Sequence, residues 1–365
     1  MKKGSGIISI SAIHYVAINS TGILNRLCLI VLNDPRPLSI AVVGAGVAGL
    51  SAARALKAHG LDVIVFEKSR GPGGRVATRE FRGIEMPRGL AGATLAFDHG
   101  AQYFTVRDDR FSSVVAEWLR DRVAAKWTGR VVAFDDEGWE DVDENTERYV
   151  GTPGMSAIGA AMAEGLDVTY GHVVDSLQPV LATVDHVILA IPPADAATLV
   201  THIPTLAGKV NDIVMKPSWT VMAAFEEKVA ARFDAAFVNG SALGWIARNT
   251  SKPKRDWKVD AWVLQATTAW SSAHLDDRPD DVGAFLMEAF EDLVRAGLPR
   301  AFYATVHRWR YATADPPLAV GAIHDRDARI TLCGDWCSGS RIEDAFLSGL
   351  AAAESLVQSF GERRL

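Results

Sequence analysis

The stretch SIAVVGAGVAGLSAARALKAHGLDVIVFEK, residues 39–68, decides the fold of this chain. Its first part, residues 40–43, is a short β-branched run of the kind that forms a buried parallel strand. Apolar residues then recur at helical spacing from Val47, and a second apolar run at residues 63–66 ends in an acidic residue. The stretch therefore predicts a βαβ unit, in which a strand, a glycine-rich turn, a helix and a second strand follow one another.

The turn of this unit has the spacing GxGxxG. Gly44 permits the tight turn, Gly46 leaves room for a pyrophosphate, and Gly49 lets the helix pack closely on the strand. Free N–H groups and the positive end of the helix dipole attract phosphate, and the acidic residue suits an adenosine ribose. A glycine-rich turn alone has a purely structural alternative, but strand, helix and acidic end together favour dinucleotide binding. The contacts expected here are Gly44, Ala45, Gly46, Gly49, Glu67 and Lys68.

A second glycine-rich turn follows directly, in KSRGPGGRVATRE at residues 68–80. A plain NAD-dependent dehydrogenase has no need of this turn, so its presence favours FAD. Residues 73–75 resemble the GGR motif of the flavin amine oxidase superfamily, whose turn and arginine lie against the FAD pyrophosphate. The resemblance makes Gly74 and Arg75 cofactor contacts, and an arginine suits phosphate oxygens in any case. The alternative is a solvated basic loop.

The C-terminal part of the chain repeats the pattern of strand, turn and helix. Residues 330–332 predict a strand followed by a Gly-Asp pair, and residues 343–357 predict a helix rich in small residues. In flavoproteins of this superfamily, a C-terminal Gly-Asp pair binds the ribityl chain of FAD, and the next helix points its N-terminus at the flavin. By this resemblance, Asp335 binds the ribityl chain, and the backbone at Asp344 and Ala345 faces the flavin. A helix dipole at this place stabilises negative charge on the reduced flavin.

Two of the three cysteines, Cys333 and Cys337, fall in this region. Their spacing differs from the CxxC of redox-active pairs, and no further cysteine or neighbouring HxH completes a set of metal ligands. The nine histidines are scattered along the chain. We therefore expect no metal site, and a redox-active pair is the alternative for the cysteines.

Six longer strings point to a narrower family. They are FDHGAQYFTVRD (97–108), GGRVATR (73–79), YVGTPGMSAIGAAMA (149–163), WIARNTSKPKR (245–255), HRWRYA (307–312) and GDWCSGSRIEDAFLSG (334–349). Together they resemble the bacterial renalases, which are FAD enzymes of the amine oxidase superfamily. The resemblance runs from about Ser39 to Val357 and leaves the N-terminal extension uncovered. The glycine-rich strings are common to the superfamily, whereas HGAQYF, ARNTSKP and HRWRYA are narrower.

The resemblance implies an α/β fold. A Rossmann-like FAD-binding domain of the amine oxidase and glutathione reductase type would carry an inserted α+β substrate domain on a mainly antiparallel sheet. The pattern agrees, because extended runs replace the alternation of strands and helices between about residues 211 and 314. The expected division is a poorly ordered N-terminal extension at 1–37, an FAD-binding domain at 38–97, 152–210 and 316–365, and a substrate domain at 98–151 and 211–315.

Renalases oxidise NAD(P)H isomers that are reduced at ring position 2 or 6, or that have the α configuration, to β-NAD(P)+. By resemblance, this chain passes a hydride from such a dihydronicotinamide dinucleotide to flavin N5, and O2 reoxidises the flavin with release of hydrogen peroxide. The ring nitrogen's lone pair drives hydride departure, so orientation is the protein's task and no general base is expected. Further expected cofactor contacts are Gln102 and Val174, and expected substrate contacts are His99, Tyr103, Trp245, Arg248, His307, Trp309 and Arg310.

Several alternatives stay open at this point. Core packing or a surface ion pair is the alternative for five of the expected substrate contacts, namely Trp245, Arg248, His307, Trp309 and Arg310. The cluster of Lys252, Lys254 and Arg255 suits a substrate with two phosphates, or forms a solvated loop marked by Pro253. The whole chain could be a flavin amine oxidase acting on a primary or secondary amine. It could also be a non-catalytic FAD-binding redox sensor or a plain NAD-binding scaffold.

Composition limits the partners. The 365 residues carry a formal charge of −6. This charge lacks the excess of Lys and Arg that binding to nucleic acid or anionic membranes requires, and it favours a small-molecule partner. Residues 4–25 lack charge, but their polar residues dilute the apolar run below a membrane span, so no stable membrane insertion is expected. Three cysteines fit a reducing cytosol and a cytoplasmic protein. The sequence leaves open the preferred isomer, NAD or NADP, amines as substrates, the oligomeric state, and the presence of residues 1–37 in the mature protein.

Overall fold

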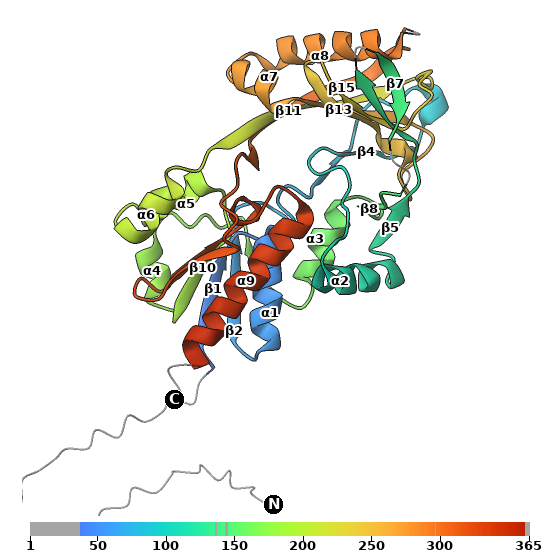
Figure 1. Cartoon of the computed structure of the whole chain (residues 1–365). Coiled ribbons are helices and arrows are strands. Elements are labelled where there is room, and N and C mark those ends of the chain that lie inside the picture. Colours follow the sequence, from blue (N-terminus) through green and yellow to red (C-terminus); the bar gives the residue numbers. More distant parts are fainter. Residues whose placement is uncertain (1–36, 136, 143–144, 296, 362–365) are drawn as a thin grey trace, which may run out of the picture. The chain divides into compact units, whose positions relative to one another are not determined.

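The computed structural model describes residues 37–135, 137–142, 145–295 and 297–361. Apart from Pro37, the expected N-terminal extension lies outside the described residues, and so does Cys28. Two sheets, of six and seven strands, hold most of the strands (Figure 1). None of the described helices combines the length and the apolarity needed to cross a bilayer.

The six-stranded sheet contains the predicted βαβ unit. Its strand order is β16 (Ala322–Asp325), β17 (Ile330–Cys333), β10 (His186–Leu189), β1 (Ser39–Val43), β2 (Asp62–Glu67) and β9 (Asp167–Tyr170). Neighbouring strands are parallel except β16 and β17. The strands predicted at 40–43, 63–66 and 330–332 are confirmed within one residue at each end.

Helices cover both faces of this sheet. Successive side chains of a strand point to opposite faces and so belong to different cores. In β1, Ile40 and Val42 belong to the core shared with α1 (Val47–Ala58), α3 (Ser156–Ala163) and α9 (Ile342–Gly361). Ala41 and Val43 belong to the core shared with α4 (Leu177–Leu181), α5 (Pro193–Val200) and α6 (Pro204–Val210). Burial on both faces explains why residues 40–43 of β1 are all apolar and do not alternate with polar residues.

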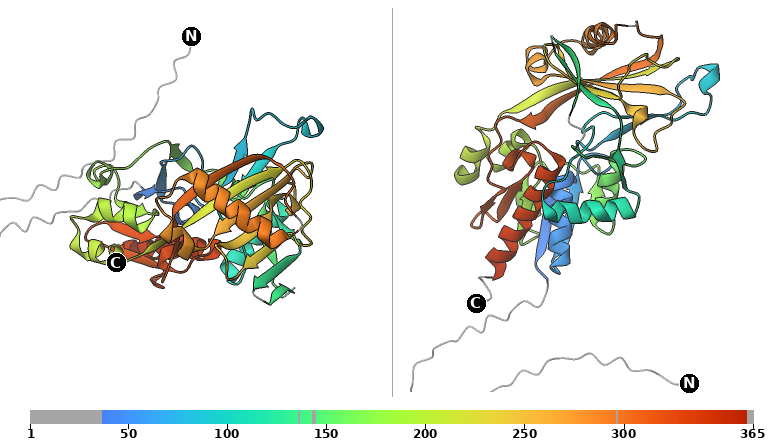
Figure 2. Two further views of the ribbon diagram at one scale, coloured as in Figure 1. Left: turned by 90° about the horizontal axis from the view of Figure 1, so that it is seen from above. Right: turned by 45° about the vertical axis from the view of Figure 1, so that its right-hand side comes forward.

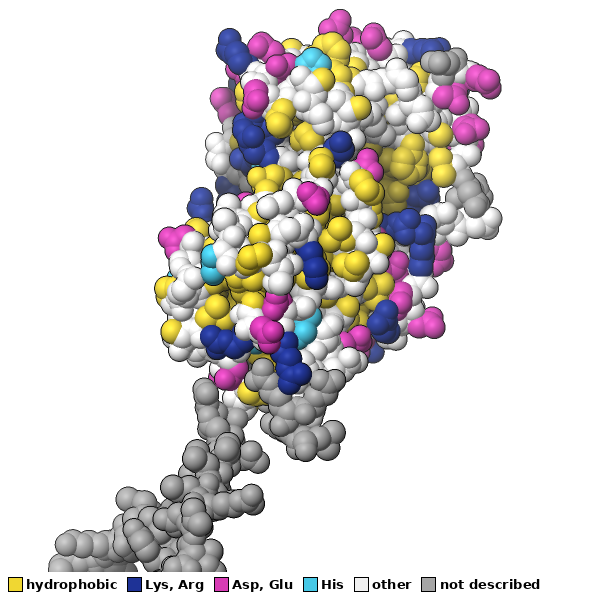
Figure 3. Space-filling view, turned by 60° about the vertical axis from the view of Figure 1, so that its left-hand side comes forward, with side chains coloured by type: hydrophobic (Ala, Val, Ile, Leu, Met, Phe, Trp, Pro, Cys, Tyr) yellow, Lys and Arg dark blue, Asp and Glu magenta, His cyan; other side chains and the backbone are white. Residues whose placement is uncertain are grey.

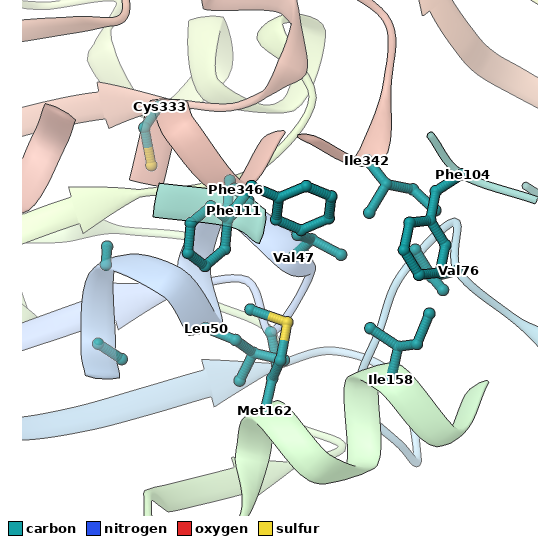
Figure 4. Close-up of a cluster of buried hydrophobic side chains, with 14 of the residues drawn as sticks. Val47, Leu50, Val76, Phe104, Phe111, Ile158, Met162, Cys333, Ile342 and Phe346 are labelled. Carbon is teal, nitrogen blue, oxygen red and sulfur yellow. The ribbon is translucent and has the colours of Figure 1, made fainter. Parts of the chain in front are cut away.

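Helices α1 and α9 lie side by side on one face of the sheet (Figures 1 and 2). A Cβ added at Gly349 would meet the carbonyl oxygen of Ala48 at 2.1 Å, so the two helices approach more closely than an alanine permits. Leu50 of α1 and Phe346 of α9 then meet Phe111 of α2 (Asp109–Arg120) in one apolar cluster (Figure 4). This packing fixes the N-terminus of α9 beside that of α1.

The seven-stranded sheet is mainly antiparallel, as predicted. Its order is β15 (Ala301–Ala314), β11 (Met215–Phe225), β14 (Asp260–Ala266), β13 (Leu243–Arg248), β12 (Ala235–Val238), β6 (Val131–Asp135) and β7 (Gly138–Asp141), and only β12 and β6 pair in parallel. Val221 and Ala223 of β11 share a core with α7 (Thr268–Ala273) and α8 (Pro279–Val294). Met222 and Ala224 pack instead against the strand pair β3 (Thr78–Phe81) and β4 (Leu95–Asp98).

The segment after β4 connects the two sheets. Ala101 donates a hydrogen bond to the carbonyl of Arg75, and the carbonyl of Gly100 accepts one from Gln265 of β14. The remaining strand pair is β5 (Ala124–Trp127) with β8 (Arg148–Gly151), and short 3-10 turns occupy Arg88–Leu90, Asn249–Ser251 and Asp335–Cys337. On the face of the molecule in Figure 3, basic and acidic side chains are interspersed, so that face carries no continuous basic surface among the described residues.

Candidate functional site

A cleft with a volume of about 960 Å³ opens at the carboxyl ends of the parallel strands. Val43, Phe66 and Gly334 line it from the six-stranded sheet, and residues of β15 line it from the other sheet. Open α/β sheets bind ligands at this edge, and the volume is at the upper end of the range of about 300 to 1,000 Å³ for ligand pockets. The cleft joins the turn at Gly46 to the turn at Asp335, as one extended ligand requires.

The three glycines of the first turn have different surroundings. Gly44 has a φ of 104°, and a Cβ added there would meet the carbonyl oxygen of Ala190 at 2.5 Å. A Cβ at Gly49 would meet the carbonyl oxygen of Gly44 at 1.9 Å, which confirms its predicted role in close packing. At Gly46, which lines the cleft, a Cβ would meet no described atom within 4 Å. Gly44 and Gly49 therefore serve the fold, whereas Gly46 leaves space inside the cleft.

The N-terminus of α1 points at this space without a capping side chain. Among the described residues, neither a side-chain cap nor an acidic residue occupies its first turn. Glu67, which is buried at the end of β2, accepts hydrogen bonds of 2.7 Å from the N–H groups of Ala45 and Ser69. These bonds fix the carboxylate at the rim of the turn. The uncapped helix end and the open side of Gly46 fit a pyrophosphate.

An ion pair joins the two distant turns. Both terminal nitrogens of Arg75 donate to the carboxylate of Asp335, at 2.8 and 2.6 Å, and one also donates to the carbonyl of Ala312 at 2.8 Å. Gly73 forms an isolated parallel bridge with Gly46, which places the two glycine-rich turns side by side. In the structure, Arg75 therefore forms a bidentate ion pair with Asp335. Its contact with phosphate stays a prediction.

Most of the expected cofactor residues line the cleft. They are Gly44, Gly46, Glu67, Lys68, Gly74, Arg75, Val174, Asp335 and Ala345. Ala45 and Gly49 belong to the first turn but do not line the cleft, and the carboxylate of Asp344 accepts a hydrogen bond from the N–H of Arg341. Gln102 is buried behind the lining and hydrogen-bonds to Asp98 and Gly100. The lining residues therefore fit a dinucleotide that extends from Glu67 to Ala345.

Aromatic rings of β15 form part of the cleft wall. His307 and Trp309 line the cleft with ring centroids 4.5 Å apart, and His99 stacks behind Trp309 at 5.1 Å. The indole N–H of Trp309 donates to the carbonyl of His99 at 2.9 Å. Burial, together with the charges of His307 and Arg79, lowers the pKa of His99 to about 4, and burial and Arg79 lower the pKa of His307. Both imidazoles are therefore neutral near pH 7.

Besides His99, two aromatic residues expected at the substrate do not line the cleft. Among the residues that the structure describes, its lining includes neither Tyr103 nor Trp245. Their rings pack on each other at 5.3 Å, and Trp245 also contacts Phe237 at 4.7 Å. The alternative of core packing describes both better than substrate contact does.

Arg248 is not a substrate contact either. Its guanidinium lies 2.5 Å from the carboxylate of Asp260 and 4.6 Å from the ring centre of Trp262, and only 6% of its side chain is exposed. It also donates to the carbonyl of Val229 at 2.9 Å. The sequence prediction is wrong because Asp260, twelve residues away on β14, neutralises Arg248 inside the larger sheet.

The structure supports neither alternative for the cluster of Lys252, Lys254 and Arg255. Lys252 has no exposed side-chain surface and Arg255 has 3%, and both contact the buried carboxylate of Asp98. Burial alone would raise the pKa of Asp98, but the charges of Lys252 and Arg255 hold it at about 2. Only Lys254 is exposed. The segment is thus neither a solvated loop nor an open phosphate site.

Sequence reasoning did not single out Asp98, Gln265 or Arg341 as site residues. Asp98 ends a short apolar strand in an acidic residue, as Glu67 does, and this shared pattern could have identified it. Arg341 lines the cleft immediately before α9, where a cation is unusual because the helix dipole disfavours it. Gln265 lies within a strand and offers no comparable signal.

The two described cysteines are free and fully buried. Burial raises the pKa of Cys333 to about 12 and also raises the pKa of Cys337. The thiolate is the reactive form, so these surroundings suit inert packing residues. This arrangement supports the interpretation of both cysteines as bystanders.

Two family models match the sequence. One family model, described as an NAD(P)-binding Rossmann-like domain, matches residues 42–118, and another, described as a flavin containing amine oxidoreductase, matches residues 136–357. Lysine-specific histone demethylase 1 homolog 1 of Arabidopsis thaliana is 43% identical over 67 residues, which are 18% of this chain and 8% of that protein. The zeta-carotene-forming phytoene desaturase of Myxococcus xanthus is 67% identical over 36 residues, which are 10% and 7%. The matches thus span less than a tenth of either relative.

Solved structures share the fold at low sequence identity. Cyclohexylamine oxidase from Brevibacterium oxydans has a TM-score of 0.67 and 11% identity, covering 89% of this chain and 100% of that one. An oxidoreductase from Methanosarcina mazei has a TM-score of 0.64 and 12% identity, covering 87% and 100%. Putrescine oxidase bound to putrescine has a TM-score of 0.60 and 14% identity, covering 88% and 100%. These structures confirm the predicted α/β fold.

Proposed function

We propose, on the premise that the chain belongs to the flavin containing amine oxidoreductase family, that it is an FAD-dependent oxidase of dihydronicotinamide dinucleotides. Membership follows from a family match over more than half of the chain. The substrates are the isomers reduced at ring position 2 or 6, or of the α configuration. The products are β-NAD(P)+ and hydrogen peroxide.

The charge of the cleft wall carries this proposal. Among the described residues, the lining contributed by the seven-stranded sheet and α7 contains no carboxylate, and Arg310 is its charged side chain. Arg341, which immediately precedes α9, adds a second guanidinium to the cleft. The lining residues of this wall offer a protonated amine no counter-charge, whereas phosphate oxygens find guanidinium groups. Arg310 also lies 3.8 Å from the carboxylate of Asp276, which is exposed and does not line the cleft. The residues of that wall are Ser218, Gln265, Thr268, His307, Trp309, Arg310, Tyr311, Ala312 and Thr313.

The carboxylates of the lining lie on the other side of the cleft. They are Glu67 at the end of β2, Asp175 after β9, Asp195 in α5 and Asp335 in the turn after β17. Asp195 is paired with Lys68 at 3.0 Å, and Asp335 is paired with Arg75. The carboxylates of the lining therefore lie on the side where we place the cofactor, and cations of the same side neutralise two of them. The opposite wall, without a carboxylate in its lining, supports a substrate that carries phosphate.

The aromatic wall suits a flat ring. His307 and Trp309 present planar surfaces, and a neutral imidazole can stack and hydrogen-bond without adding charge. A dihydropyridine bound there needs orientation more than acid or base, because its own nitrogen drives hydride departure.

The chain's own residues then have distinct tasks. The end of α1 binds the pyrophosphate, Glu67 binds the adenosine ribose and Asp335 binds the ribityl chain. Arg310 and Arg341 bind substrate phosphate, and the β15 wall orients the ring and excludes water. When bound, FAD supplies the hydride acceptor and reacts afterwards with oxygen.

Anaerobic stopped-flow mixing tests the proposal. The purified protein with its flavin is mixed in turn with 6-dihydro-NAD, 2-dihydro-NAD, α-NADH, cyclohexylamine and putrescine, and flavin absorbance is followed. We expect fast bleaching by at least one dihydronicotinamide and none by the amines. Fast bleaching by the amines alone would establish an amine oxidase. A protein that binds flavin but is bleached by no donor would be a redox sensor, and one without flavin would overturn the assignment.

A pair of variants tests the charged wall. Arg310→Gln should raise the KM for dinucleotide substrates roughly tenfold, since a hydrogen bond to a charged group contributes about 1.5 to 3 kcal/mol. Arg300→Gln is the matched control, because Arg300 is 83% exposed and does not line the cleft. Equal KM values for both variants would remove Arg310 from the substrate site.

A further inference from the structure

Behind the cleft wall, one buried carboxylate faces two buried cations. The Oδ2 atom of Asp98 lies 3.1 Å from Nζ of Lys252 and 2.5 Å from the guanidinium of Arg255. Its Oδ1 atom accepts hydrogen bonds from Thr78 at 2.7 Å and from the N–H of Met155 at 2.9 Å. Asp98 is thus fully bonded, and among the described residues in contact with its carboxylate the cations outnumber the anion.

The excess charge needs a reason, because removing a cation from water destabilises the folded state. Arg255 alone would neutralise Asp98, and it also donates to the carbonyls of Gly151 and Pro253. Lys252 is therefore not required for charge balance. A side chain as apolar as methionine would fill its place without desolvating a charge.

What Lys252 adds is a contact with Gln102. Its Nζ donates to Oε1 of Gln102 at 3.1 Å and to Oδ1 of Asn249 at 3.2 Å. An ammonium group can only donate, so it fixes which end of the Gln102 amide is the acceptor. The amide nitrogen is then directed at the carbonyls of Asp98 and Gly100, the latter at 3.1 Å.

The carbonyl of Gly100 belongs to the cleft wall. It also accepts a hydrogen bond of 2.8 Å from Gln265, and both Gly100 and Gln265 line the cleft. A Cβ added at Gly100 would meet the carbonyl oxygen of Arg75 at 2.0 Å, so the wall lies tightly against the arginine that clamps Asp335. A chain of contacts thus runs from Lys252 through Gln102 and Gly100 to Arg75.

We propose that Lys252 is a positioning residue, which orients the amide of Gln102 and thereby holds the Gly100 segment of the cleft wall against Arg75 in the geometry that binds flavin. This inference rests on the proposed function, because it requires that FAD bind in the cleft. It assigns Lys252 neither to the substrate nor to the chemistry.

Lys252→Met tests the inference, because it keeps the length of the side chain and leaves the pair of Asp98 and Arg255 intact. The Kd for FAD should rise roughly tenfold, since a hydrogen bond from a charged group is lost, and the visible spectrum of the bound flavin should shift. Lys258→Met is the matched control, because it removes the same charge from an exposed position nearby. It should leave the Kd and the spectrum unchanged.

Gln102→Leu is a second variant, and it keeps the ion pairs of Asp98. It should reproduce the spectral shift even if Lys252→Met does not fold. If both variants fold and bind FAD with the wild-type Kd and spectrum, Lys252 has no positioning role. If the wild-type protein itself binds no FAD, the proposed function fails first, and the two failures are distinguished by flavin content.

A pH profile separates positioning from simple packing. Burial lowers the pKa of Lys252 to about 8, so the flavin spectrum of the wild type should change between about pH 7 and 9. The other charged groups in contact do not titrate there, because the pKa of Asp98 is about 2 and a guanidinium stays charged. The change should be absent in Lys252→Met, and a profile identical to that of the wild type would contradict the inference.

Discussion

The glycine turn at residues 44–49 and the charge cluster at Asp98 both shape the cleft, but they do so over different lengths of chain. In the turn, Gly49 contacts Gly44 five residues away, and the geometry depends on the absence of side chains. In the cluster, Asp98 contacts Lys252, which is 154 residues away, and the geometry depends on three complete side chains. The first region is local and sterically fixed, whereas the second is assembled by the whole fold and electrostatically fixed.

The largest expected effect comes from the turn. Gly49→Val places a Cβ where it would meet the carbonyl oxygen of Gly44 at 1.9 Å, and both atoms belong to the packed junction of β1 and α1. We expect no folded protein, which corresponds to a loss above about 5 kcal/mol in the free energy of unfolding. Circular dichroism without denaturant checks this expectation, because an unfolded variant shows no urea transition.

Gly46→Ala is the matched variant within the same turn. Its Cβ meets no described atom within 4 Å, so the stability should change by less than about 1 kcal/mol while flavin content falls. If Gly46→Ala kept its flavin, the space beside Gly46 would not be the pyrophosphate site. If Gly49→Val melted close to the wild-type temperature, the turn would not be sterically fixed.

The cluster should give the next largest effect. Asp98→Asn leaves Lys252 and Arg255 buried without their counter-charge, and breaking a buried ion pair in this way costs about 3 to 5 kcal/mol. The double variant with Lys252→Met should lose less than Asp98→Asn alone, because one unpaired cation is removed. Urea unfolding of the four proteins gives this comparison, and additive losses would mean that the charges do not interact.

The same contrast explains what could be predicted from the sequence. The strands around Gly44, the role of Gly49 and the meeting of Gly46 with Asp335 in one cleft follow from spacing and from a resemblance that covers nearly the whole chain. Each depends on a residue type at a fixed distance along the chain. A fixed spacing of such residues allows few backbone conformations, so the motif predicts the local structure.

The charged residues could not be placed in this way. Arg248 and Lys252 suit a phosphate from their sequence, and their true partners, Asp260 and Asp98, come from other strands. A side-chain charge identifies no partner until the register of the sheets brings one within reach. The sequence predictions therefore failed where residue type was known and tertiary contact was not.

A smaller effect is expected from pH. Lys252 titrates in the folded protein at about 8 and in the unfolded chain near its ordinary value of 10.5, so the unfolded state binds more protons between these values. Stability contributed through Lys252 should therefore rise as the pH increases from 8 to 10.5. Urea unfolding of the wild type and Lys252→Met across this range should show the difference in favour of the wild type growing. If the difference in the free energy of unfolding stayed constant from pH 8 to 10.5, the pKa of Lys252 would not differ between the folded and unfolded states in this range.

The smallest effect is expected from thiol chemistry, which tests whether the C-terminal turn excludes solvent reagents from Cys333 and Cys337. Cys333 and Cys337 are fully buried, and with a pKa of about 12 only roughly one Cys333 thiol in ten thousand is a thiolate at pH 8. In a Cys28→Ser variant, a thiol reagent should react only as fast as the protein unfolds, and mild oxidation should leave activity unchanged. Rapid labelling of the native protein, or a disulfide formed by mild oxidant, would restore the redox interpretation. It would also show that the C-terminal turn opens in the native protein.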